Sequence, residues 1–396
     1  MFEFLSRHVR RSAVLVLLVL TLAAIAAFAA VSHLVTRFTL NQQARGRHLY
    51  AQGRTDLDAG NSTLAIEEFR AALTCDPDNS QYQLSLGRAL RDTGRLDEAE
   101  SYLQSLWERT PEDGTINLAL ARVAARRGSV DDATRYYHNA MYGLWTADSD
   151  ANRRKARIEL IEFLLQKNAV EQARSEILAL AAFLPPDSDP ALYLQVAQFL
   201  TLARDYPNAL AEYEKILHVE RANSTALAGA GNAAFRIGHY RTAQHYLQVA
   251  LALNPSDAAS LNLLATTDAI READPFVRGI SDAERNRRIV ADFAKAGDRL
   301  ASCAQQKGVS LEPANPPAPA TTASAPPSSL SALHDRWLAT KRDLPRLRSI
   351  GETDLPDAIM DVVFQIEQQT ADVCAEPQGV DQALLLVSRD REGADQ

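Results

Sequence analysis

The sequence has few cysteines, few aromatic residues and none of the short motifs that identify common enzyme classes. Its three cysteines, Cys75, Cys303 and Cys374, form no CxxC pair, which argues against a structural zinc site and a thioredoxin-like redox motif. Aromatic residues make up only 7% of the chain, and GxSxG, GxxxxGKS/T and HExxH are all missing. We therefore predict that the protein is not an enzyme and needs no metal ion or cofactor.

Positive charge is also scarce relative to negative charge. The chain of 396 residues has 42 Lys and Arg against 50 Asp and Glu, a net charge of -8. A nucleic-acid-binding protein needs a concentrated basic surface, so we predict no nucleic-acid partner. Glycine and proline number 17 each, whereas alanine and leucine are the most frequent residues. Because alanine and leucine lose little side-chain freedom in a helix, this composition predicts an all-α fold.

The N-terminal region contains a long apolar stretch. Residues 12–35 include no Asp, Glu, Lys or Arg, and about 20 apolar residues in helical form cross a bilayer. The stretch therefore predicts a transmembrane helix over 12–35. A cleaved signal peptide is the alternative, because Ala27 and Ala29 have the small-residue spacing of a cleavage site.

The charges beside this stretch predict its orientation. Arg7, Arg10 and Arg11 precede it within five residues, whereas Arg37 is the nearest basic residue after it. Since basic residues favour the cytoplasmic side, we predict a cytoplasmic segment 1–11 and a periplasmic body on a bacterial inner membrane. The reverse topology, with the body in the cytoplasm, stays open.

A period of 34 residues runs through the chain after residue 45. Small residues and prolines recur in register. The first copy has Gly53, Gly60, Ala65 and Pro77; the next has Gly87, Gly94, Ala99 and Pro111; the third has Ala121, Gly128 and Ala133; a later copy has Gly231, Gly238, Ala243 and Pro255. Such a period indicates one supersecondary unit repeated along a solenoid.

The pattern resembles the tetratricopeptide repeat, a helix-turn-helix of about 34 residues. Four segments match it best: 46–79, 80–113, 114–147 and 224–257. Two others, 154–187 and 190–223, are degenerate because Asn168 and Arg204 replace the turn glycine, and a half repeat starts at 258. The resemblance implies a right-handed solenoid of helical hairpins over 46–273 that binds other proteins or peptides.

The resemblance also places the ninth repeat position on the concave groove of the solenoid. Arg54, Arg88 and Arg122 occupy it in the first three copies, with Arg91 and Arg126 about one helical turn further on. These arginines predict a site for an acidic peptide or a C-terminal carboxylate. Asn232 matches the asparagine of the family's carboxylate clamp, but Ala228 stands at one of the clamp's lysine positions.

A purely structural interpretation of the arginines is also open. Arg54 with Asp58, and Arg88 with Asp92, have the i,i+4 spacing of helix ion pairs, whereas Arg122 has Arg126 at that spacing. Such pairs would leave little charge free for a partner.

The region after the repeats predicts a cap, a linker and a helical block. Ser281 and Glu284 have capping-box spacing before an amphipathic helix, which we expect to cover the end of the solenoid. Residues 312–329 are rich in Pro, Ala, Ser and Thr, which is typical of an extended linker. The block that follows includes a predicted apolar helix stripe, formed by Ile359, Val362, Val363, Ile366 and Val373. In an oxidising compartment, Cys303 and Cys374 could form a disulfide across the linker; two buried thiols are the alternative.

We therefore predict a membrane-anchored protein-interaction scaffold for envelope assembly or export. A chaperone-like periplasmic factor and a cytoplasm-facing recruitment adaptor are the alternatives. The predicted segments are a cytoplasmic segment 1–11, a transmembrane helix 12–35, a juxtamembrane segment 36–45, the repeats 46–273, a capping helix 274–308, a linker 309–329 and a C-terminal helical block 330–396.

Overall fold

The computed structural model describes residues 2–185, 189–311, 329–348 and 354–394, and these residues form helices joined by short loops. The chain divides into two compact units, Met1–Ala182 and Phe183–Gln396, here called the N-terminal unit and the C-terminal unit. The all-α repeat fold that the sequence predicts is confirmed.

Eight helices of the N-terminal unit are described. They are α1 (Phe2–Asp58), α2 (Ser62–Cys75), α3 (Ser80–Asp92), α4 (Leu96–Arg109), α5 (Gly114–Arg127), α6 (Val130–Tyr142), α7 (Ser149–Gln166) and α8 (Val170–Ala182). Those of the C-terminal unit are α9 (Pro190–Leu202), α10 (Tyr206–Val219), α11 (Ser224–Arg236), α12 (Tyr240–Leu253), α13 (Ala258–Ala273), α14 (Asp282–Gln306), α15 (Ser329–Lys341), η1 (Leu344–Arg348), α16 (Leu355–Val373) and α17 (Val380–Ala394).

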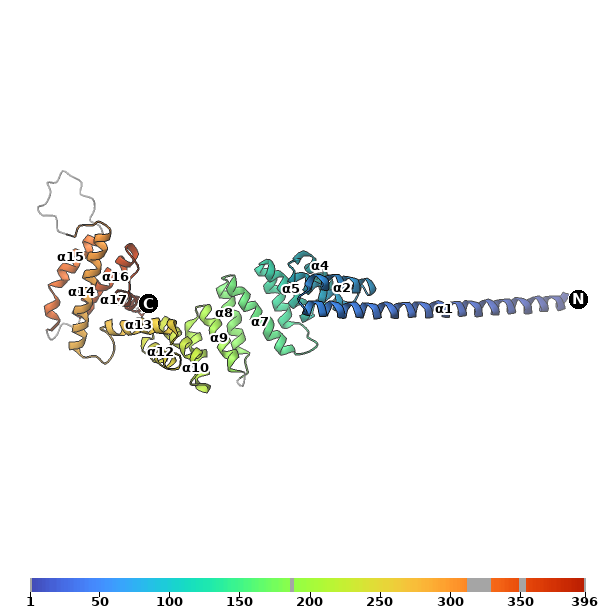
Figure 1. Cartoon of the computed structure of the whole chain (residues 1–396), viewed down its shortest axis with the longest axis horizontal. Coiled ribbons are helices and arrows are strands. Elements are labelled where there is room, and N and C mark those ends of the chain that lie inside the picture. Colours follow the sequence, from blue (N-terminus) through green and yellow to red (C-terminus); the bar gives the residue numbers. More distant parts are fainter. Residues whose placement is uncertain (1, 186–188, 312–328, 349–353, 395–396) are drawn as a thin grey trace, which may run out of the picture. The chain divides into compact units, whose positions relative to one another are not determined.

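Helix α1 joins the apolar stretch directly to the first repeat. It is unbroken from Phe2 to Asp58, so the predicted juxtamembrane segment 36–45 is helical too. Figure 1 shows its C-terminal part beside α2. Within the described residues, one helix, over Leu18–Asp58, is long and apolar enough to cross a membrane, although a signal sequence meets the same criterion. Its large apolar side chains are exposed, Phe28 at 75% and Leu34 at 71%, so no protein contact explains them.

The hairpins pack through the small residues of the repeat. Ala99 on α4 is completely buried, and a Cβ atom added to Gly87 on α3 would lie 2.8 Å from the Leu103 side chain. The absence of a side chain at Gly87 therefore lets the two helices approach, as the 34-residue pattern predicts.

The turn inside each hairpin has a left-handed residue whether or not it is glycine. Gly60, Gly94 and Gly128 have φ of +82°, +79° and +80°. The degenerate copies keep the same turn, with Asn168 at +56° and Arg204 at +57°. These side chains strain the backbone locally, because a Cβ atom disfavours this conformation.

Replacing Arg204 by glycine should therefore stabilise the C-terminal unit by about 1 kcal/mol, since relief of strain outweighs the added freedom of the unfolded chain. The reciprocal change, Gly94→Ala, should destabilise the N-terminal unit by about the same amount. No atom lies within 4 Å of a Cβ added there, so only the backbone conformation is tested. Denaturant unfolding measures both; a destabilised Arg204→Gly would contradict the strain argument.

The end of the C-terminal unit is a helical bundle whose core includes the last repeat helix. Ile270 and Ala273 of α13 share one apolar cluster with α14, α16 and α17. Helix α14 begins at Ser281, whose hydroxyl accepts from the Glu284 backbone, as expected of an N-cap. However, α14 packs mainly on α16, and α17 packs along α13. Helix α13 is therefore covered by several helices of the bundle, and not by the predicted capping segment 274–308 alone.

Two further details of this region differ from expectation. Of the predicted apolar stripe, Val373 is 38% exposed, because α16 ends there, whereas the other four positions are buried. The sequence also predicts one helix from Leu330 to Leu344, but α15 ends at Lys341 and is followed by the short 3-10 helix η1. Most of the predicted linker, 312–328, lies outside the described residues.

Candidate protein-binding groove

The arginines at the 34-residue period lie on the first helices of consecutive hairpins and line two pockets of the N-terminal unit. Arg54 of α1 lines a pocket of about 300 Å³ together with Tyr50, Asp58 and Arg88. Arg88 of α3 also lines a second pocket of about 390 Å³ together with Arg122 of α5. Arg88 is thus the residue common to both pockets.

Arg88 carries a positive charge that no ion pair among the described residues compensates. Its Nε atom is buried without a hydrogen-bond partner. Burial lowers the pKa of the guanidinium, and the neighbouring Arg122 and Arg91 lower this pKa further. The group nevertheless stays protonated at neutral pH. Among the described residues, neither Arg88 nor Arg54 forms an ion pair, so the i,i+4 contacts with Asp92 and Asp58 are not made.

The carboxylate expected to neutralise Arg88 binds its neighbour instead. Asp92 accepts hydrogen bonds from Arg91, with a shortest distance of 2.7 Å. Only 15% of the Arg91 side chain is exposed. Arg91 therefore lies beside the pockets as part of a compensated pair and has little charge to offer a partner.

The charge of Arg122 is also compensated, by a carboxylate on another helix. Its Nε and Nη2 atoms donate to the two carboxylate oxygens of Glu159 on α7, at 2.8 and 2.7 Å. This two-bond contact raises the pKa of Arg122. The i,i+4 spacing alone predicts no ion pair for Arg122, because Arg126 occupies that position. Arg126 is exposed, and none of the ion pairs recorded for the described residues involves it.

The second pocket is bounded by the segment that joins two successive hairpins, where the repeat register is interrupted. Residues 143–148 lead from α6 to α7 and lie against the start of α5. The Gly114 amide donates to the Leu144 carbonyl at 2.8 Å, and the Leu144 amide donates to the Glu112 carbonyl at 2.7 Å. A Cβ atom on Gly114 would lie 2.4 Å from the Trp145 ring, so the indole packs directly on the α5 backbone.

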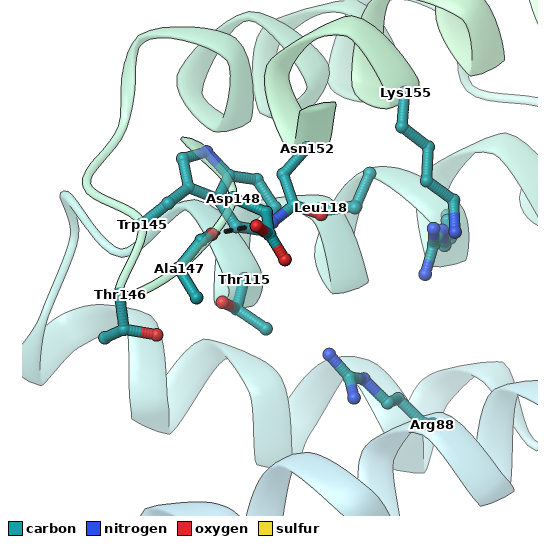
Figure 2. A pocket seen from close by; sticks show the side chains of 10 residues that line it. Arg88, Thr115, Leu118, Trp145, Thr146, Ala147, Asp148, Asn152 and Lys155 are labelled. Carbon is teal, nitrogen blue, oxygen red and sulfur yellow. Dashed lines mark hydrogen bonds between the residues drawn. The ribbon is translucent and has the colours of Figure 1, made fainter. Parts of the chain in front are cut away.

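Sequence reasoning missed eight of the ten residues that line this pocket. Among them are Thr115, Trp145, Asn152 and Lys155, which line it together with Arg88 and Arg122. Figure 2 shows the Lys155 and Arg88 side chains entering from opposite sides, with Thr115 and Trp145 along the wall. The available signal was the six-residue gap in register between the copies 114–147 and 154–187.

Asn232 does not share a pocket with the arginines. It belongs to α11 of the C-terminal unit and lines a separate pocket of about 560 Å³ with Tyr213, Ala228 and Arg236. Small residues dominate this wall, and the Tyr213 ring lies close over Gly229. Asn232 therefore lines a pocket within the C-terminal unit, where Arg236 and Asp257 are the charged lining residues.

The described part of the chain contains no group of three or more His, Cys, Asp or Glu side chains placed to hold a metal ion. The pockets of the N-terminal unit contain cationic hydrogen-bond donors beside an aromatic ring. That arrangement suits non-covalent binding of an anionic group.

Comparisons with known proteins agree with the repeat pattern. A family profile described as tetratricopeptide repeat matches residues 50–113 and 228–267. No curated protein matches the chain. Among solved structures, PilF of Pseudomonas aeruginosa is 17% identical, with a TM-score of 0.39 over 57% of this chain and 99% of that protein.

Two other solved structures show a similar degree of likeness. The C-terminal part of a repeat protein from Cytophaga hutchinsonii is 13% identical, with a TM-score of 0.44 over 61% of this chain and 92% of its own. PilW, a type IV pilus biogenesis factor, is 16% identical, with a TM-score of 0.38 over 55% and 98%. Both segments matched by the family profile lie within the hairpins described above.

Proposed function

Because the chain is a tetratricopeptide-repeat protein, a protein-interaction scaffold, we propose that it is anchored in a membrane and recruits partners by their acidic segments. The observation that carries the proposal is Arg88, a half-buried cation whose Nε atom has no hydrogen-bond partner. Arg54, in the adjoining pocket, extends the cationic surface along the first-helix face.

The energetics favour a carboxylate as the group that Arg88 binds. A buried donor without a partner costs about 1–3 kcal/mol, and a charged donor costs more. An incoming carboxylate would bind the part of the Arg88 guanidinium that lines the two pockets. The charge-assisted hydrogen bond that it forms is about twice as strong as a neutral one.

The anchor in this proposal is the apolar part of α1. An exposed apolar helix that continues into the first repeat without a loop would hold the groove at a short, constant distance from the bilayer. The arginines at 7, 10 and 11 favour a cytoplasmic N-terminus and a periplasmic body. We place the partners accordingly among proteins of envelope assembly or export.

Reversing the charge at Arg88 tests the proposal. In membranes containing the full chain, crosslinking followed by identification of captured proteins defines the wild-type partners. Arg88→Glu should lower their recovery by about tenfold or more, because one charge-assisted contact contributes about 1.5–3 kcal/mol and its reversal adds repulsion.

Arg135→Glu is the matched control, with the same change of charge on an exposed residue of α6 that is not among the pocket-lining residues. Recovery should stay at the wild-type level in this variant. Equal recovery from wild type and Arg88→Glu would show that partners bind elsewhere.

A further inference from the structure

We infer that the pocket closed by residues 143–148 recognises a two-residue signal, an acidic residue next to an apolar or aromatic one, in a partner peptide. This inference rests on the proposed function, since Arg88 contributes to both. It adds a second cation, Lys155, and an apolar contact, Trp145, neither of which is one of the recurring positions of the 34-residue pattern.

The pocket has a specific charge balance. Lys155 is exposed and forms no ion pair within the described part of the chain, and Arg88 is likewise uncompensated. Arg122 is neutralised by Glu159. The carboxylate of Asp148 lines the same pocket. Two free cations and one carboxylate leave one net positive charge, which favours a singly charged carboxylate over the doubly charged phosphate group.

The positions of the two cations suit one shared ligand group. Arg88 comes from α3 and Lys155 from α7, and their side chains point into the same space from opposite sides (Figure 2). A carboxylate between them would accept hydrogen bonds from both. Asp148, at the start of α7, makes no capping hydrogen bond, and so its carboxylate is available to accept from a backbone amide of the bound peptide.

The Trp145 ring accounts for the apolar or aromatic residue of the peptide signal. The Trp145 indole nitrogen donates to the Ala140 carbonyl at 2.9 Å. Its hydrogen-bonding capacity is therefore used, and the half-buried ring presents carbon atoms beside Leu118. An apolar side chain next to the acidic residue would bury area against this ring, at about 25 cal/mol per Å².

The test uses the full chain in detergent and pools of fluorescein-labelled eight-residue peptides. The pools share the same random residues and differ at the two central positions, which are Asp-Phe, Asn-Phe, Asp-Ala or phosphoserine-Phe. Asp and Asn have nearly the same shape, so their comparison isolates charge. The fraction retained by immobilised protein is measured for wild type, Lys155→Glu, Trp145→Ala, Arg88→Glu and the control Arg135→Glu.

We expect wild type and Arg135→Glu to retain the Asp-Phe pool about tenfold better than the Asn-Phe pool, the ratio for one charge-assisted contact. Lys155→Glu should remove this preference. Because Lys155 is an exposed helical residue, the variant should fold, which circular dichroism checks. Trp145→Ala should remove the preference for Phe over Ala while keeping that for Asp over Asn.

Three results would overturn the inference. They are equal retention of the Asp-Phe and Asn-Phe pools by wild type, an Asp preference that survives Lys155→Glu, and stronger retention of the phosphoserine pool than of the Asp-Phe pool. If the Asp preference survives Lys155→Glu but is lost in Arg88→Glu, the proposed function stands and only this pocket is excluded. If it survives both substitutions, both proposals fail.

Discussion

Replacing Glu367 by glutamine should stabilise the C-terminal unit at pH 8 and reduce its pH dependence. Glu367 lies on α16 with no exposed surface, and both its carboxylate oxygens lack hydrogen-bond partners. Burial, reinforced by Asp381, raises the pKa of this carboxyl from its ordinary value of 4.5 to about 8. The group is therefore protonated in the folded protein at neutral pH.

Other charged groups of the bundle modify the pKa of Glu367, but the net shift remains upward. Arg299 on α14 lowers it, but its guanidinium donates to the Thr370 hydroxyl and the Ala375 carbonyl rather than to a carboxylate. Asp292, also on α14 and 4% exposed, raises it. Asp292 is itself affected in the same direction, because burial raises its pKa to about 7.

The direction of the pH effect follows from the two states of the chain. The unfolded chain loses the Glu367 proton near pH 4.5, whereas the folded chain keeps it until about pH 8. Stability therefore falls as pH rises through this interval, and the loss is complete above it. At about 1.4 kcal/mol per pKa unit, the destabilisation by Glu367 at high pH is on the order of 5 kcal/mol.

Glu367→Gln should therefore raise the unfolding free energy by a few kcal/mol at pH 8 and change it little at pH 5. Trp337 of α15 is a suitable probe, because its ring stacks on Phe293 in the bundle, with the ring centroids 5.3 Å apart. Fluorescence-detected unfolding in a background with the other two tryptophans replaced by phenylalanine reports this unit.

Asp372→Asn, which changes an exposed carboxylate on the same helix, is the matched control and should leave the pH profile unchanged. An unchanged pH profile in Glu367→Gln would mean that Glu367 does not ionise within the folded unit. Glu367→Met has no polar group at this position. Comparing it with Glu367→Gln separates the effect of losing the charge from the cost of burying an amide without hydrogen-bond partners.

Removing the link between Cys303 and Cys374 should weaken the same unit by about 4 kcal/mol, the chain-entropy value for a loop of this size. The structure joins Cys303 of α14 to Cys374 at the end of α16, with a Cα–Cα distance of 5.8 Å and a sequence separation of 71 residues. The bond closes a loop that includes α15 and η1, and it restricts the unfolded chain more than the folded one.

Unfolding of the Cys303→Ala/Cys374→Ala double variant, compared with wild type before and after reduction, measures this contribution. Cys75, which is a free thiol in the N-terminal unit, provides the control substitution, Cys75→Ser. Reduction should destabilise wild type and Cys75→Ser but not the double variant. Equal stability of oxidised and reduced wild type would contradict the predicted contribution.

The same bond tests the side of the membrane. Disulfides persist in oxidising compartments and are rare in the cytoplasm. Alkylation of the chain in freshly lysed cells, followed by intact-mass measurement, should modify one cysteine if the body is periplasmic. Modification of all three cysteines would place the body in a reducing compartment and overturn the proposed orientation.

The sequence alone was sufficient for the repeat architecture. Gly87 and Ala99 mark where helices cross, and Gly60 and Gly94 mark left-handed turns, because both requirements act within one hairpin of about 34 residues. The apolar stretch after residue 12 is equally local information. Even the degenerate copies obeyed the pattern, since Asn168 and Arg204 adopt the backbone of the glycine that they replace.

The charge of the groove and the burial of the bundle were decided only by tertiary structure. Arg122 and Arg88 occupy the same repeat position, yet Arg122 binds Glu159, 37 residues away, and Arg88 has no ion-pair partner among the described residues. Likewise, the residues around Glu367 in the sequence do not predict that its carboxylate has no exposed surface. Helix boundaries depend on near neighbours, whereas the partner of a charged side chain depends on which helices the packing of the whole unit brings beside it.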